Sequence, residues 1–403
     1  MNSKKDMTKP LLKNVLAISH RLFLSSLLTS LTVLAPASVY AKGPACGPLF
    51  SAEGSAKSPA IDGSWRKVSA DLFMGFRSNA PHYWNWLRSQ KSPLLEARGV
   101  VSGDPHILNF GDIPLKNGKR EYALIDVDDS GVNAPLAGDF LRYFVGNQIS
   151  GFKVHPKDLY NAYLDGLSGQ TMAKPDYLTS VESKSADKFS QRQEKYLDKI
   201  SQNKKFSGNA PVSSLTTAPK EIQDLYKRSL ETFKNLIQDH SILDVGYRIK
   251  DSGGSMGLPR FWFLLEKKGQ RHVWEFKLET DPASSLFAVQ PDALDRFTEV
   301  SKVYRPSEKA AGPYGFIQSG NDVFLVRERF DVYFDLDPAK AVSKKDIQDG
   351  QEMSLYLANQ MGLRHGAQQD GTKLLKSLEK SGSYDSFLNL AKDYANLISQ
   401  ENQ

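Results

Sequence analysis

The clearest alternation of apolar and polar positions lies between residues 242 and 332. Residues 243–249, the run F-W-F-L-L-E at 261–266 and the run H-V-W-E-F-K-L-E at 272–279 are rich in aromatic and β-branched residues, and K-K-G-Q at 267–270 separates the last two. This pattern predicts a β-hairpin with a third strand beside it. The runs G-F-I-Q-S-G and N-D-V-F-L-V-R-E-R-F at 315–330 predict a further pair of strands.

Helical spacing of apolar residues is found on both sides of this segment. It predicts helices near 65–89, after Asp139, at 158–167, at 222–237, at 291–304 and at 343–368, and a last helix that buries Phe387, Leu390, Tyr394 and Leu397. Residues 172–220 are polar and rich in Lys and Ser, which is typical of a surface excursion. Together these segments predict an α+β protein with two lobes.

Two short apolar runs each lead to an aspartate. Residues 99–101 precede Asp104 and residues 122–125 precede Asp126, with His106 and Asn109 between them. If the two runs form neighbouring strands, both carboxylates and the amide meet at one edge. Oxygen ligands of this kind suit Mg²⁺, and the second carboxylate can act as a base.

A glycine-rich segment follows the first predicted strand of the alternating region. Its residues Gly253, Gly254, Ser255 and Gly257 would allow backbone amides to approach a phosphate, although most glycine clusters are simple turns. About twenty residues later, Lys277 lies within a predicted strand, where it could bind a phosphate or merely face solvent. The two features together favour a nucleotide site.

The first residues differ from the rest of the chain. Five basic residues precede an apolar segment at 22–37, which ends in S-V-Y-A at 38–41. This order predicts an export signal cleaved after Ala41, with a retained N-terminal anchor as the alternative. A periplasmic or secreted protein is therefore expected, with no membrane span once the signal is removed. The single cysteine, Cys46, has no partner for a disulfide or a metal site.

The composition is that of an ordinary globular protein: 403 residues, 40% hydrophobic and 24% charged. Loss of residues 1–41 removes five basic residues and one acidic residue, so the formal charge falls from +6 to +2. A nearly neutral mature chain gives no support to nucleic-acid binding.

The loop G-D-P-H-I-L-N at 103–109 resembles the catalytic loop of kinase-like phosphotransferases of the aminoglycoside and choline kinase type, whose pattern is G-D-x-H-x-x-N. The segment I-D-V-D at 125–128 resembles their metal-binding D-F-G motif. More closely, the chain after the signal resembles a bacterial family of unknown function, domain-of-unknown-function family 2252 (DUF2252). That family has G-D-x-H-x-x-N-F-G, then D-F-D-E and G-P-x-x-W-D-x-x-R, and later G-x-G-S-x-G and K-E.

This sequence departs from the family pattern at a few positions without losing a candidate metal ligand. The departures are Val127 for Phe, Gly138 for Trp, Ala134 for Gly and Ser78 for Gly. Among the aromatic residues that precede the motifs, Arg77 could bind an anionic group near the site, although packing of a helix explains that segment equally well.

The resemblance implies a role for each candidate residue. Asp104 would orient or deprotonate an acceptor hydroxyl, with His106 supporting the loop. The residues that would hold Mg²⁺ are Asn109, Asp126 and, as a second ligand, Asp128. Lys277 would contact the phosphates of ATP and pair with Glu299, or alternatively with Glu279. Asp139 and Arg142 would be structural.

The order of the motifs predicts a circularly permuted kinase-like fold, because the catalytic loop precedes the glycine loop by about 150 residues. Residues 42–94 would be a lead-in with an aromatic helix, and 95–240 most of the large lobe. Residues 242–332 would be the nucleotide lobe, and 343–403 would complete the large lobe. The acceptor is unspecified, and transfer of a nucleotidyl group stays open.

Two other functions fit parts of the pattern. A metal-dependent phosphoesterase shares G-D-x-H, but such dinuclear sites use several histidines, and the seven here include no H-x-H pair. A binding protein that keeps the fold without catalysis is the other alternative, since ATP is scarce outside the cytoplasm.

Overall fold

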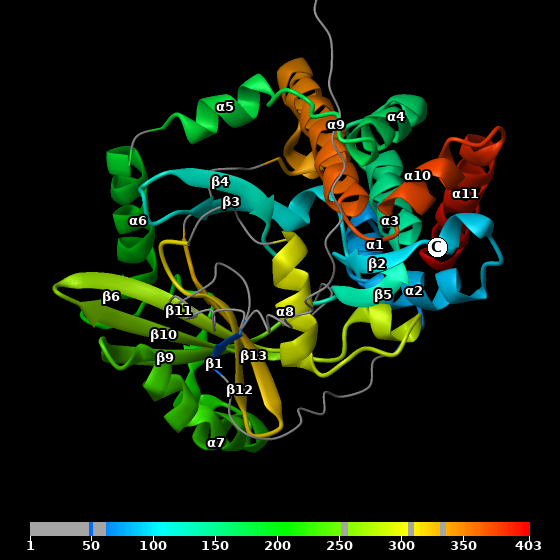
Figure 1. The fold of residues 1–403 in the computed structure, drawn as a ribbon. Helices are drawn as coiled ribbons and strands as arrows, with labels where there is room; N and C mark the ends of the chain where they lie inside the picture. Colours follow the sequence, from blue (N-terminus) through cyan, green and yellow to red (C-terminus); the bar gives the residue numbers. More distant parts are fainter. Residues whose placement is uncertain (1–47, 51–61, 185, 251–256, 305–309, 331–335) are drawn as a thin grey trace, which may run out of the picture. The chain divides into compact units, whose positions relative to one another are not determined.

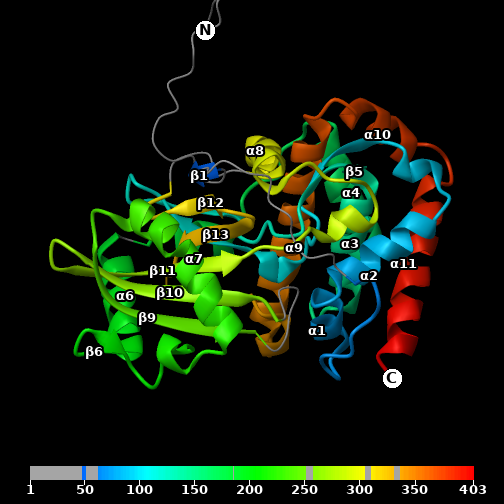
Figure 2. The same ribbon diagram turned by 90° about the horizontal axis from the view of Figure 1, so that it is seen from below.

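The computed structural model describes residues 48–50, 62–184, 186–250, 257–304, 310–330 and 336–403 (Figures 1 and 2). All of them belong to one compact unit that spans residues 41–403. The predicted export signal at 1–41 and the glycine-rich residues Gly253, Gly254 and Ser255 lie outside the described residues. In the described part of the chain, no helix has the length and apolarity needed to cross a membrane.

A seven-stranded sheet contains the five predicted strands of the alternating region and two short strands from outside it, which the sequence did not predict. Its strand order is β1-β12-β13-β11-β10-β9-β8, and every neighbouring pair is antiparallel except β1 and β12. The strands are β1 (Pro48–Phe50), β8 (Ser213–Ser214), β9 (Ser241–Ile249), β10 (Pro259–Lys267), β11 (Gln270–Leu278), β12 (Tyr314–Ser319) and β13 (Asp322–Glu328). The five longest strands all come from residues 241–328, the predicted nucleotide lobe.

Local chemistry fixes the register of the β10–β11 hairpin. Its two-residue turn, Lys268-Gly269, has positive φ at both positions, +51° and +78°, which matches the twist of the flanking strands. Because side chains alternate along a strand, Phe261 and Phe276 face one side of the sheet while Arg260 and Lys277 face the other. The first face is covered by α7 (Lys220–Ile237).

The second face of the sheet is covered by several elements. Helix α6 (Ala186–Ile200) packs over Trp262, Leu264 and Val273. Helix α8 (Ala293–Tyr304) and the hairpin of β3 (Phe110–Pro114) and β4 (Arg120–Leu124) pack over β12 and β13. The polar side chains on the rest of this face, such as Arg260 and Lys277, therefore face the loop that follows β4.

The rest of the molecule is a helical layer with an aromatic core (Figure 2). Its helices are α1 (Leu72–Arg77), α2 (Ala80–Ser89), α3 (Leu136–Ile149), α4 (Pro156–Leu167), α5 (Asp176–Glu182), α9 (Lys344–Gly366), α10 (Gly371–Leu378) and α11 (Ser383–Glu401). A capping box of Ser343 and Asp346 starts α9. In the last helix Phe387 and Tyr394 are buried, as predicted, while Leu390 and Leu397 are only partly buried.

Short elements complete the connections. The strands are β2 (Arg98–Val101), β5 (Gly131–Pro135), β6 (Ser201–Gln202) and β7 (Lys205–Phe206), and the 3-10 helices are η1 (Pro93–Leu95), η2 (Ile107–Asn109), η3 (Leu215–Thr217), η4 (Ala283–Leu286) and η5 (Pro338–Lys340).

One sequence-based expectation about local structure is wrong, and another is incomplete. Residues 172–220 lie largely at the surface, as expected, but they hold the helices α5 and α6, because a few apolar residues such as Val181 and Leu197 anchor these polar helices to the core. The runs before Asp104 and Asp126 are not neighbouring strands, since β2 pairs with β5 and β4 pairs with β3. The two aspartates therefore come from separate two-stranded ladders.

Candidate functional site

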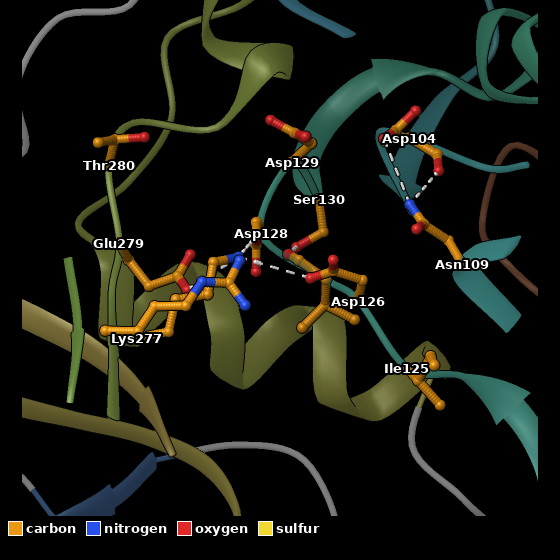
Figure 3. Close-up of polar contacts among 12 residues, drawn as sticks. Asp104, Asn109, Ile125, Asp126, Asp128, Asp129, Ser130, Lys277, Glu279 and Thr280 are labelled. Atoms are coloured by element: carbon orange, nitrogen blue, oxygen red, sulfur yellow. Dashed lines mark hydrogen bonds and ion pairs between the residues drawn. The ribbon is translucent and has the colours of Figure 1, made fainter. Parts of the chain in front are cut away.

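The loop after β2 holds Asp104 in a fixed position through its own side chains. Asn109 donates from Nδ2 to the backbone oxygen of Asp104 at 2.8 Å and to its Oδ2 at 3.3 Å (Figure 3). His106 is buried, with Nε2 3.4 Å from the same Oδ2. The backbone amide of Ile125 donates to the Asn109 carbonyl at 2.9 Å. This last bond joins the Asp104 loop to the strand end that leads into Asp126.

Arg142 is the ion-pair partner of Asp104. Its Nε and Nη2 lie 2.7 and 2.5 Å from Oδ1, and both side chains are nearly inaccessible to solvent. Burial acts to raise the pKa of Asp104, but Arg142 and His106 outweigh it and lower that pKa to about 2. Asp104 is therefore ionised at neutral pH and is a weak base. Arg142, expected to be structural, positions this carboxylate directly.

Asp139 supports the same loop from the first turn of α3. Its carboxylate accepts hydrogen bonds from the backbone amides of Ser102 and Gly103 at 2.8 and 2.9 Å. On the other side it contacts the Tyr304 hydroxyl at 3.3 Å and Nε2 of His365, on α9, at 3.4 Å. The loop that carries Asp104 is thus attached to helices from distant parts of the chain.

A second cluster surrounds Lys277, which is fully buried on β11. Its ammonium group forms a close ion pair with Asp128 and lies 3.7 Å from Asp126 and 3.6 Å from Glu279 (Figure 3). Burial acts to raise the pKa of Asp126, but the charges of Lys277 and Arg327 hold it well below the usual range. Burial raises the pKa of Glu279. Figure 3 shows Asp126 between Lys277 on one side and Asn109 on the other.

The prediction that Glu299 pairs with Lys277 is wrong. Glu299 is exposed on α8 and pairs with Lys302 at 2.6 Å, three residues further along the same helix. The alternative, Glu279, is the residue that lies beside Lys277, because it follows two positions later on the same face of β11. Of the glycine-rich segment, Gly257 is described: its φ is +84°, and its amide donates to the Lys250 carbonyl at 2.8 Å.

One residue from α8 contributes to the site although no motif includes it. Arg296 is buried and donates from Nη1 to the backbone oxygens of Asp128 and Ser130 at 2.9 and 2.7 Å. It therefore fixes the backbone that presents Asp126 and Asp128. Asp129, in the same segment, accepts from the Ala283 amide at 2.9 Å, and burial raises the pKa of its carboxyl to about 7.

The carboxylates of Asp126 and Asp128 have oxygens that suit Mg²⁺. Oδ1 of Asp126 and Oδ1 of Asp128 are buried without a hydrogen-bond partner, which suits an oxygen ligand of a cation. Asn109 directs its amide nitrogen at Asp104, so its side-chain oxygen is left for a ligand. In the described part of the chain, no three His, Cys, Asp or Glu side chains form a metal cluster. The residues fit a Mg²⁺ that keeps waters and phosphate oxygens as its other ligands.

A cavity of about 410 Å³ lies between the sheet and the loops that carry Asn109 and Asp126. This volume is typical of small-molecule sites. Its lining has four acidic residues and seven basic ones: Arg77, Arg120, Arg248, Lys250, Arg260, Arg327 and Arg329. Of the candidate site residues, Asp104, His106, Asp128 and Lys277 do not line it. The excess of positive charge suits an anionic ligand.

Glu275 organises the basic side chains on the sheet. This fully buried carboxylate accepts from Nε of Arg327 at 2.9 Å and from Trp262 Nε1 at 2.8 Å, and it lies 3.4 Å from Arg260. Burial acts to raise its pKa, but Arg327, Arg329 and Arg260 hold it well below the usual range. The arginine side chains are thereby oriented before any ligand binds.

Three basic residues lie in a row across neighbouring strands. Arg248 on β9 is directly opposite Arg260 on β10, which is opposite Lys277 on β11. Like charges in directly opposed positions destabilise a sheet unless carboxylates compensate them, and here Glu275 pairs with Arg260 while the cluster of Asp126, Asp128 and Glu279 surrounds Lys277. In the sequence, each of the three residues falls on the same alternating face of a predicted strand. Only the register of the folded sheet shows that they are aligned.

No protein family model, no curated protein and no solved structure matches the chain. The function proposed below therefore depends on the chemistry of the cavity and on the sequence motifs.

Proposed function

We propose that this protein is a kinase-like phosphotransferase that binds Mg-ATP in the basic cavity and transfers a phosphoryl group to a hydroxyl acceptor. The observation that carries the proposal is the combination of a strongly basic cavity with Asp126 and Asn109 in its lining. Mg²⁺ held by Asp126 and Asn109 would neutralise phosphate charge. Phosphoryl transfer requires positioning and charge neutralisation, and both are present in the cavity.

Asp104 then orients the acceptor. In the reaction, the bond between the γ-phosphorus and the oxygen that bridges to the β-phosphate breaks, and ADP leaves with its electron pair. A new bond forms between that phosphorus and the acceptor oxygen. The hydroxyl proton passes to Asp104 late in the transfer and from there to solvent. A carboxylate whose pKa is about 2 does this only when the acceptor oxygen has already gained positive charge.

Lys277 has a supporting role in this proposal. Because it is fully buried among Asp126, Asp128 and Glu279, it holds the carboxylates in place. The phosphates are bound by cations that line the cavity, of which Arg260 and Arg327 are the best oriented.

The proposal includes membership of DUF2252, a circularly permuted kinase-like arrangement and export of the mature chain. The sheet built from residues 241–328 and Asp126 of the preceding segment line one cavity, as a permuted order of lobes would require. The family motifs of the sequence supply the remaining support.

The test is nucleotide binding measured by thermal shift and calorimetry, with the whole protein and Mg-ATP. A ligand present at 100 times its dissociation constant stabilises the folded state by about 2.7 kcal/mol. We expect this stabilisation to need Mg²⁺ and to be lost in Asp126→Asn. The exposed control Asp393→Asn should behave as wild type. Absence of any Mg-ATP effect on the wild-type protein would reject the proposal, and binding without turnover of any acceptor would favour the non-catalytic alternative.

A further inference from the structure

Two cations in the cavity come from opposite sides and pair with no carboxylate among the described residues. Arg77 is the last residue of α1, in the helical layer, and Lys250 directly follows β9, in the sheet. Each feels the charge of Asp126, and Lys250 also feels that of Arg77. Both side chains line the same cavity as Asp126, the carboxylate that would hold Mg²⁺.

Arg77 is mostly buried, and its guanidinium is incompletely satisfied. Its Nε is buried without a hydrogen-bond partner, and its contact on α1 is with the sulfur of Met74, 3.3 Å from Nη1. Burial lowers the pKa of Arg77, while the charges of Asp104, Asp337 and Asp126 act to raise it. Arg77 therefore brings an incompletely bonded guanidinium group into the cavity from the helical layer.

Lys250 is half-buried among like charges. Burial lowers its pKa to about 8, and repulsion from Arg260, Arg77 and Arg248 adds to the effect of burial. Holding an ammonium group among three guanidinium groups destabilises the folded protein. A bound anion between these side chains removes that destabilisation, so the arrangement indicates an anionic ligand.

We propose that Arg77 and Lys250 bind the phosphoryl group while it is being transferred, and so act as catalytic residues. The inference rests on the proposed function. A group in transit lies between the acceptor oxygen, beside Asp104, and the carboxylate that would hold Mg²⁺, Asp126. Arg77 feels both of these charges. Arg260 and Arg327 are already attached to Glu275 and bind the phosphates that stay with ADP.

The transferred group becomes planar during the reaction, while its total negative charge stays nearly the same. As the bond to the β-phosphate oxygen lengthens and the bond to the acceptor oxygen forms, negative charge remains on the three equatorial oxygens of the transferred group. Two donors aimed at those oxygens from opposite sides stabilise this arrangement more than the ground state, which is the requirement for catalysis.

The experiment compares Mg-ADP with Mg-ADP plus aluminium fluoride, whose planar anion mimics a phosphoryl group in transit and needs no acceptor. Dissociation constants are measured by calorimetry for wild type, Arg77→Met, Arg77→Lys and Lys250→Met. We expect aluminium fluoride to tighten ADP binding by wild type about 100-fold or more, in the range of transition-state analogues. Each Met variant should lose at least about 10-fold of this gain while its affinity for Mg-ADP alone is unchanged.

Arg88→Met is the matched control, since Arg88 is exposed at the end of α2. Arg77→Lys keeps the positive charge but lacks the planar guanidinium group with its paired donors. It should therefore retain part of the tightening by aluminium fluoride. Normal Mg-ADP binding shows that a variant is folded; if Arg77→Met does not fold, Arg77→Lys and Lys250→Met decide the result. Variants that keep the full gain, or that weaken both complexes equally, overturn the inference. The inference is also overturned if aluminium fluoride does not tighten the binding of Mg-ADP by the wild-type protein. A wild-type protein that does not bind Mg-ADP overturns the proposed function itself.

Discussion

Replacing Glu275 with Gln tests whether this carboxylate organises the basic face of the sheet. The substitution keeps the size of the side chain and an oxygen for Trp262 Nε1, but removes the charge shared by Arg260, Arg327 and Arg329. Removing one partner from a buried ion pair costs about 3–5 kcal/mol, because the remaining charge is buried without compensation. We expect a loss of this size in the free energy of unfolding.

The assay is urea denaturation followed by circular dichroism, with and without sulfate. Sulfate stabilises most proteins, so the quantity of interest is the extra stabilisation of Glu275→Gln relative to wild type. A sulfate ion bound in the cavity supplies the negative charge that the substitution removes. The loss in the free energy of unfolding should therefore be smaller with sulfate than without it. Glu299→Gln is the control; this exposed residue pairs with Lys302 on the same helix, and its substitution should change stability by less than about 0.5 kcal/mol. A loss below about 1 kcal/mol in Glu275→Gln, or no extra effect of sulfate, would refute the reasoning.

Three further substitutions probe other features. Lys250→Met should raise the free energy of unfolding at pH 7 by on the order of 1 kcal/mol after allowance for solvent screening. The pKa of Lys250 is about 8 in the folded protein and 10.5 ordinarily, so below pH 8 the charged lysine destabilises the folded state by its full amount. The stability difference between Lys250→Met and wild type should therefore disappear between pH 8 and 10.5 in urea titrations. A difference that stays constant with pH would contradict this. Gly103→Ala should cost about 2 kcal/mol or more, since φ is +83° and a Cβ would overlap the carbonyl oxygen of Asp129. Gly362→Ala should cost about 1–3 kcal/mol in the same assay, because a Cβ would overlap the Tyr163 carbonyl where α9 crosses α4; an unchanged midpoint in either glycine variant would show that the backbone yields freely.

Much of the sheet was predictable because its signals are local. The turn at Lys268-Gly269 and the alternation on β10 and β11 depend only on residues close in sequence, and so do the strands β12 and β13. The pairing of β2 with β5 was not predictable, since it joins residues that are 30 to 37 positions apart in the sequence. Helix α6 was missed because its apolar residues are too few to stand out in a polar segment.

The site was only partly predictable. Asp104, Asn109, Asp126 and Lys277 carry recognisable spacing, and the structure brings them to one region. Glu299 was chosen from its position near a helix end, but the orientation of α8 directs Arg296 inward instead.

The contributions of other residues to the cavity could not be read from the chain. Arg77 has an ambiguous sequence signal, because an arginine among aromatic residues is common in helices that pack on a core. The alignment of Arg248 with Arg260 requires a strand register, and a register is a property of the folded sheet.

The hydrogen bonds of Asp139 also determine when the site can form during synthesis. Its partners Ser102 and Gly103 leave the ribosome early, but Tyr304 and His365 belong to the last quarter of the chain. Since synthesis proceeds from the N-terminus, the loop that carries Asp104 acquires its full support only when α9 has emerged. A nascent chain that ends before α9 holds nearly every site residue in sequence yet lacks the contacts that fix them. We expect the completed protein to bind Mg-ATP, and a synthesis intermediate that ends before α9 not to bind it.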